Sequence, residues 1–215
     1  MSEKSTGLNV LLTFAELEFI FQDDPRWPLM RDQFNGVPPA CHEIIDAGMT
    51  SLLVRDMATI GPDHIVTVRT EVKDLTSAIT ESPCPVGVAL MLEAGAAPAV
   101  YCPTRHGKRA LVSVELPGIL LLQDLPNYVP PVDQAMQLVE KAASVPDVVV
   151  GVKAVNQAGC LFRRQGAAWQ LGDLSRDPAD LDSFFQPSTQ AVVMDAARVY
   201  LTQHLGPVLS EDGQS

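Results

Sequence analysis

The chain has 215 residues, of which 47% are hydrophobic and 19% are charged, so it can bury a sizeable core. Its 26 acidic and 15 basic side chains give a formal net charge of −11 at pH 7. That charge argues against non-specific binding to nucleic acid and against attraction to anionic membrane surfaces, because both need a basic face. A basic or neutral partner is easier to accommodate.

The start of the chain reads as a short polar tail and not as a targeting signal, because no long apolar run follows Lys4. The uncharged stretch from Ser82 to Met91 extends only to Glu93 and is too short to cross a bilayer. We therefore expect a cytoplasmic protein that does not insert into membranes, with tails at residues 1–7 and 207–215. In that compartment its four cysteines are expected to remain reduced; they are Cys41, Cys84, Cys102 and Cys160.

The first predicted elements are a strand at Leu8–Leu12 and a helix that begins at Thr13. Thr13 and Glu16 have the spacing of a capping box, in which each side chain bonds the other residue's backbone N–H. The stretch Asp23–Pro28 ends this helix. Trp27 lies between two prolines in this stretch, so we take it as a candidate exposed anchor for a protein partner.

Pro38 and Pro39 open a second helical region, in which apolar residues between Ile44 and Ile60 recur every three or four positions. Gly48 lies inside this apolar stripe and would allow two short helices there. From Ile65 to Lys73 the apolar period changes to two, which predicts a half-buried strand. Asp74–Thr80 is expected to be a short helix or a loop.

The middle of the chain predicts three strands, at Val86–Leu92, Ala97–Cys102 and Ala110–Leu116. The turn Arg105–Arg109 holds the densest basic cluster, and we interpret it as a solvated hairpin tip and not as an anion site. After it, Ile119–Leu122 is an apolar run whose type the pattern leaves open.

The second half begins after a proline-rich linker at Pro126–Pro131. The pattern after the linker predicts a helix at Val132–Ala143 and then strands at Val148–Val155, Cys160–Arg164 and Ala168–Leu171. We expect an acidic helix at Asp177–Phe185 after these strands, and a last helix from Pro187 to Gly206-Pro207.

The order helix–strands–helix therefore occurs twice, without the alternation that a parallel sheet requires. This predicts an α+β fold with a largely antiparallel central sheet flanked by helices. We expect a single domain over residues 8–206, which the repeat would divide into two quasi-equivalent halves, 8–126 and 132–206.

Sequence motifs for common chemistry are missing. The chain contains no glycine-rich phosphate loop and no G-x-S-x-G nucleophile elbow. The pairs Cys41-His42 and Cys102…His106 lack the paired spacing of a structural zinc site. We therefore predict no catalytic residue, no cofactor site and no metal site, and we expect that the chain is not an enzyme.

Four stretches resemble a known family when they are taken in order. Leu12–Leu17 reads leucine-threonine-x-x-glutamate-leucine, and Ala47-Gly48-Met49 is a small–glycine–aliphatic break before the apolar run Leu52–Ile60. Val86–Pro126 is rich in strands and ends in leucines and a proline, and Cys160–Leu171 contains Trp169 before a last helix. This order resembles the EspG family, the cytosolic specificity chaperones of mycobacterial type VII (ESX) secretion.

The resemblance implies a non-catalytic chaperone or adaptor that holds a helical PE/PPE-type export substrate and shields its apolar tip. Such a protein needs an apolar patch with a polar rim. We place the candidate patch near the proline linker, where it would consist of Leu120, Leu121, Leu122 and Tyr128. Trp27 is a further candidate for contact with the partner.

Two alternative functions remain open. The net charge of −11 would also suit an acidic inhibitor or an immunity-type protein that neutralises a basic partner. A small enzyme that uses a pocket without a recognisable motif is the other alternative.

Overall fold

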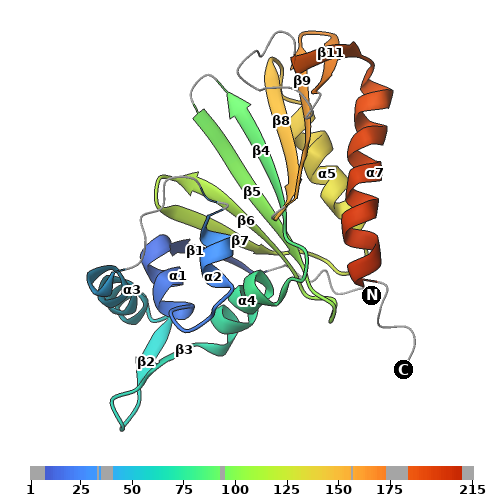
Figure 1. Cartoon of the computed structure of the whole chain (residues 1–215). Coiled ribbons are helices and arrows are strands. Elements are labelled where there is room, and N and C mark those ends of the chain that lie inside the picture. The colour runs from blue at the N-terminus through green and yellow to red at the C-terminus, as the bar shows by residue number, and fades with distance from the viewer. Residues whose placement is uncertain are drawn as a thin grey trace, which may run out of the picture.

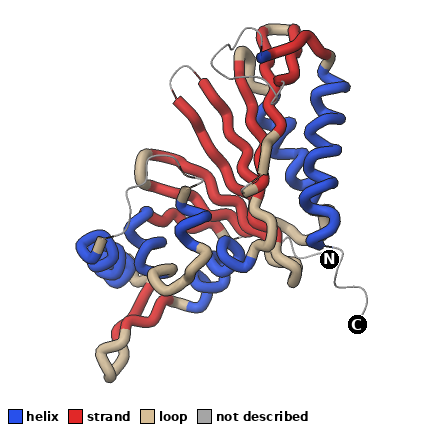
Figure 2. The backbone as a smooth tube through the Cα atoms, in the orientation of Figure 1, coloured by secondary structure: helices blue, strands red, loops and turns tan. Residues whose placement is uncertain are grey.

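The structure is a computed structural model and describes residues 8–32, 34, 41–92, 95–155, 157–172 and 184–209. Among these residues, one antiparallel sheet of nine strands has the order β1-β7-β6-β5-β4-β8-β9-β10-β11, and β2 and β3 form a separate hairpin. Figure 2 shows the large sheet as one twisted surface with the helices outside it. The expected α+β fold with an antiparallel sheet flanked by helices is confirmed.

The elements have the following bounds in chain order: β1 (Asn9–Thr13), α1 (Phe14–Ile20), α2 (Trp27–Arg31), α3 (His42–Val54), β2 (Ala58–Ile60), β3 (Val66–Val68), α4 (Thr70–Glu81), β4 (Val86–Leu92), β5 (Gly95–Pro103), β6 (Arg109–Leu116), β7 (Ile119–Asp124), α5 (Pro131–Ala143), β8 (Val148–Ala154), β9 (Cys160–Gln165), β10 (Ala168–Gly172), β11 (Phe185–Ser188) and α7 (Gln190–Leu209).

Helices cover the two ends of the sheet on opposite faces. Figure 1 shows α1 to α4 gathered around β1, β7 and β6, whereas α5 and α7 lie beside β4, β8 and β9. The change of face occurs within β5, where Val100 and Cys102 belong to the first core and Tyr101 belongs to the second. Neighbouring residues of a strand point to opposite faces, so one strand can supply both cores.

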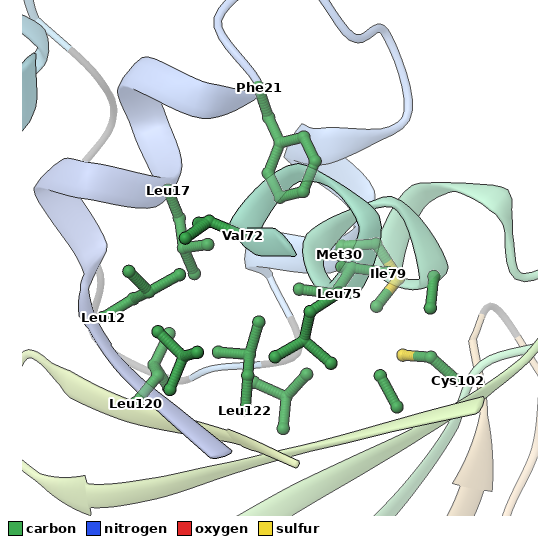
Figure 3. Close-up of a cluster of buried hydrophobic side chains, with 14 of the residues drawn as sticks. Leu12, Leu17, Phe21, Met30, Val72, Leu75, Ile79, Cys102, Leu120 and Leu122 are labelled. Atoms are coloured by element: carbon green, nitrogen blue, oxygen red, sulfur yellow. The ribbon is translucent and has the colours of Figure 1, made fainter. Parts of the chain in front are cut away.

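The first core lies between α1–α4 and the strands β1, β7, β6 and β5. Leu12, Leu120 and Leu122 are fully buried there, and Figure 3 shows them directed from the strands towards the helices. Leu17 of α1 and Ile79 of α4 meet them from the helical side. Burying side chains of this size stabilises the fold by roughly 1.5–3 kcal/mol each.

The second core lies between β4, β8 and β9 on one side and α5 and α7 on the other. Val86, Val150 and Phe162 are fully buried against Val139 of α5 and Leu201 of α7. β4 precedes the linker at residues 126–131 in the chain but packs in this second core. The two cores therefore do not coincide with the sequence halves 8–126 and 132–206.

The first strand and first helix confirm two sequence predictions. Thr13 is the N-cap of α1, its hydroxyl accepts from the backbone N–H of Glu16 at 3.1 Å, and its own N–H donates to the Glu16 carboxylate at 2.7 Å. The predicted capping box is thus present.

Other element boundaries differ from the sequence predictions. The strand expected at Ile65–Lys73 ends at Val68, and Thr70 begins α4. Val72 and Leu75 are both buried against the first core, and this helical spacing of three overrides the shorter period-two pattern. Residues 44–54 stay in one helix despite Gly48.

The last part of the chain also departs from its prediction. Pro187 lies in β11 and does not begin the last helix, and α7 continues through Gly206-Pro207 to Leu209. The acidic helix expected at Asp177–Phe185 lies almost entirely outside the described residues, although Phe185 itself is in β11.

Candidate functional site

The patch predicted near the linker is divided between the two faces of β7. Leu120 and Leu122 have 0% of their surface exposed and pack in the first core, so neither reaches a partner (Figure 3). This corrects the prediction for these two leucines. Leu121 lies between them and therefore points to the other face of the sheet, where it is only half-buried.

Trp27 is the second correction. Only 2% of its surface is exposed, and its ring lies 5.1 Å from that of Phe21 between centroids. Its indole Nε1 is buried with no hydrogen-bond partner among the described residues. Trp27 begins α2 and its side chain packs in the first core, so it does not act as an exposed anchor.

Leu121 belongs to a surface that no described helix covers. In the sheet register, Leu121 lies opposite Leu11 of β1 and opposite Ser113 of β6, so all three point to the same side. Leu11 is 48% exposed, and Gln123 lies two residues along the same face. We call the surface formed by Leu11, Ser113, Leu121 and Gln123 the first open face.

The linker after β7 is fixed at one end of this face by Arg109. The guanidinium of Arg109 donates to the carbonyl oxygens of Val129 and of Pro126, the latter at 3.5 Å. It also donates to Oε1 of Gln134 on α5 at 3.3 Å. Tyr128 lies between the two residues whose carbonyls Arg109 binds, and 82% of its surface is exposed. The aromatic ring is therefore accessible to solvent, whereas the backbone on both sides of it is fixed by hydrogen bonds.

This arrangement also changes the interpretation of the basic turn. Arg109 is only 8% exposed and works as an internal support of the linker, so it is not part of a solvated tip. His106 and Lys108 are exposed as expected, and Lys108 lies 3.5 Å from the carboxylate of Asp74.

Tyr101 extends the same hydrogen-bonded cluster into the second core. Its hydroxyl donates to Gln134 Oε1 at 2.9 Å, and Gln134 Nε2 donates to the Pro126 carbonyl at 3.2 Å. Burial raises the pKa of the Tyr101 hydroxyl, an effect that the nearby Arg109 charge opposes. The phenol remains a neutral donor, and the cluster ties α5, the linker and the sheet together.

The partly and fully buried thiols are held in their protonated form. Burial raises the pKa of Cys84, Cys102 and Cys160. The thiol is much less nucleophilic than the thiolate. Each of the four cysteines is free, and Cys41 is the exposed one.

A groove of about 440 Å³ lies where the two helix groups approach each other. Leu29 of α2, Ile79 of α4, Cys84 and His204 of α7 are among its lining residues. Across the described parts of the chain, no group of three or more histidine, cysteine, aspartate or glutamate side chains is arranged to hold a metal ion. None of the helices that the structure describes is long and apolar enough to span a bilayer.

Sequence reasoning singled out one residue of the first open face, Leu121, and the neighbouring Tyr128 on the linker. It missed the other three residues of the face, which are Leu11, Ser113 and Gln123. The alternation of buried and exposed residues in β1 contained the signal for Leu11, because Val10 and Leu12 are its buried neighbours. No protein-family model matches the chain, and no curated protein matches it.

Proposed function

We propose that this chain is a non-catalytic chaperone or adaptor of the EspG kind, which binds a helical PE/PPE-type heterodimer in the cytoplasm before export. The observation that carries the proposal is the first open face together with the exposed Tyr128 on its anchored linker. A half-apolar surface with polar residues beside it suits reversible binding of a folded partner.

The chemistry of the first open face suits an apolar helical tip. Leu11 and Leu121 offer aliphatic contacts, and Ser113 and Gln123, which lie beside Leu121, offer hydrogen-bonding groups. Glu115 accepts from the Ser113 hydroxyl at 3.1 Å and adds a negative charge at the edge. Tyr128 supplies a large side chain that loses few rotamers when it is covered.

Two of the four stretches that carry the family resemblance, Leu12–Leu17 and Ala47–Met49, lie against each other. Thr13 and Glu16 form the capping box of α1, and the Glu16 carboxylate accepts from Ser51 Oγ of α3 at 2.7 Å. Gly48 of α3 packs directly on the backbone of Ala15. The two stretches are therefore linked by contacts that account for their spacing.

A binding experiment with matched variants tests this proposal. The full chain is co-expressed with a PE/PPE-type pair, and complex formation is measured by size-exclusion chromatography with light scattering. We expect a complex with the wild-type chain, and affinity about tenfold lower or worse for Leu121→Arg, because an interfacial apolar contact is lost.

Val54→Arg is the control, since Val54 is 81% exposed at the end of α3, on the opposite side of the sheet. Far-ultraviolet circular dichroism verifies that both variants fold. The proposal fails if the wild-type chain does not bind the pair, or if Leu121→Arg binds as tightly as Val54→Arg.

A further inference from the structure

The sheet has a second surface that none of the described helices covers, at its other end and on its other side. Ala89 of β4 lies opposite Gly151 of β8, and Gly151 lies opposite Leu161 of β9, so these side chains share one face. Met91 and Lys153 flank them on β4 and β8. We call these five residues the second open face. α5 and α7 cover the reverse side of the same strands.

The centre of this surface is apolar. Met91 is 38% exposed, and Ala89, Gly151 and Leu161 are half-buried. A Cβ at Gly151 would lie 3.5 Å from Cδ1 of Leu161 and 3.8 Å from Cε of Met91, so these two side chains border the glycine. A ligand backbone can approach closely where a strand presents glycine and alanine.

Strand pairing determines which kind of element can bind there. β4 pairs with β5 and β8, and β8 pairs with β4 and β9, so both edges of each strand are already hydrogen-bonded. An added strand would find no free backbone groups, whereas a helix can pack on the face. In this molecule α4, α5 and α7 cover the other faces of the sheet in that way.

Charge determines which helix fits. Within their bounds, the described strands β4, β5, β8, β9, β10 and β11 contain no aspartate or glutamate, in a chain whose net charge is −11. Glu93, between β4 and β5, and the four aspartates of residues 173–183, between β10 and β11, lie outside the described residues. The three basic residues of these strands are Lys153, Arg163 and Arg164.

The two basic residues that share the face are placed at its margin. Lys153 is exposed, and Arg163 lies opposite Val149, the residue that pairs with Met91. The Arg163 guanidinium is held by Gln170 at 2.6 Å and lies 4.6 Å over the Phe185 ring. Arg164 points to the other side, where it caps the end of α5 through the carbonyls of Ala143 and Ser144.

We propose that the second open face is a docking surface for an amphipathic helix of a partner protein, with an apolar stripe flanked by aspartate or glutamate. The apolar stripe covers Met91 and Leu161, and the acidic flanks meet Lys153 and Arg163. This surface lies on the side of the sheet away from the first open face, so it does not rest on the proposed function. Both surfaces can be occupied at once, which would make the chain a bridge between two proteins.

A peptide titration tests this assignment. The probe is a synthetic helix of about 18 residues, or five turns, with a leucine–alanine stripe flanked by glutamates; a second peptide has lysines in place of the glutamates. Nuclear magnetic resonance of the ¹⁵N-labelled full chain reports binding residue by residue. We expect the glutamate peptide to shift amides of β4, β8 and β9, and to bind about fivefold or more tightly than the lysine peptide.

Two charge reversals complete the test. Lys153→Glu is expected to lower the affinity for the glutamate peptide about fivefold. Lys141→Glu, at an exposed position on α5, is expected to leave that affinity unchanged. Equal affinity for the two peptides, shifts confined to other strands, or equal effects of both variants would overturn the proposal. So would a dimer in light scattering that Met91→Glu dissociates, because a second copy of this chain would then be the occupant.

Discussion

Glu16 shows how a single buried charge organises the first half of the molecule. Its carboxylate is fully buried, lies 2.7 Å from a guanidinium nitrogen of Arg55, and accepts from Ser51 and from the backbone of Thr13. Arg55 also donates to the Leu11 carbonyl at 2.6 Å. One acidic side chain thus connects β1, α1 and α3.

Replacing this carboxylate tests its structural importance. We expect Glu16→Ala to lower the free energy of unfolding by about 2–4 kcal/mol, because Arg55 and Ser51 lose a buried partner. Urea denaturation followed by circular dichroism measures the change. Glu140→Ala, at an exposed position of α5, is the control and is expected to cost far less. Equal losses in both variants would contradict this account of Glu16.

At the scale of the element, the packing of α1 on α3 depends on Gly48. A Cβ placed there would lie 1.8 Å from the carbonyl oxygen of Ala15, closer than any contact allows. The close approach explains why a glycine stands in the middle of α3, where it otherwise weakens a helix. In Figure 1 the two helices lie side by side at the end of the sheet.

This contact reverses the usual sign of a glycine-to-alanine change. In a free helix interior the change stabilises by roughly 0.5–1 kcal/mol. We expect Gly48→Ala to destabilise by about 1–3 kcal/mol instead, because α1 and α3 must move apart. Thermal unfolding of the Gly48→Ala variant and of the wild-type chain gives the comparison, and a stabilised Gly48→Ala would refute the close contact.

Elements with a strong local pattern were predictable from the sequence, and elements set by tertiary packing were not. The strand Val86–Leu92 was predicted with its observed bounds, and the capping box gave the start of α1. The pattern at Thr70–Lys73 fits a strand or a helix. The helix forms because it buries Val72 and Leu75 on the same side. Gly48 suggested a break because the sequence does not show that α1 packs against it.

The candidate site was only partly predictable for a related reason. A run of three leucines does not reveal its own register in the sheet, so Leu120, Leu121 and Leu122 were grouped together. Pairing with β1 and β6 buries the first and third and leaves the second on the open side. Tyr128, which was named as a candidate binding residue, is exposed on the linker, where prolines on both sides keep the segment out of regular structure.

For the whole molecule, the main feature is one sheet with helices on opposite faces at its two ends. Tyr101 and Val100 are neighbours in β5 but belong to different cores. Because the sheet is continuous between the cores, disruption of one core removes strand partners from the other. We therefore expect the two cores to unfold together.

Unfolding of the full chain tests that cooperativity. Trp27 reports on the first core and Trp169, packed against the second, reports on the other. We expect single-tryptophan variants, Trp27→Phe and Trp169→Phe, each to show one fluorescence transition that coincides with its own loss of circular dichroism. Transitions separated from each other in either variant would indicate that the two cores unfold independently.

The most direct test of the proposed function is methyl nuclear magnetic resonance of the leucine-labelled chain with and without a PE/PPE-type pair. The first open face predicts large shifts for the methyl groups of Leu11 and Leu121 on binding, with little change at the buried Leu120 and Leu122. Binding that leaves Leu11 and Leu121 unchanged, or no binding at all, would contradict the account.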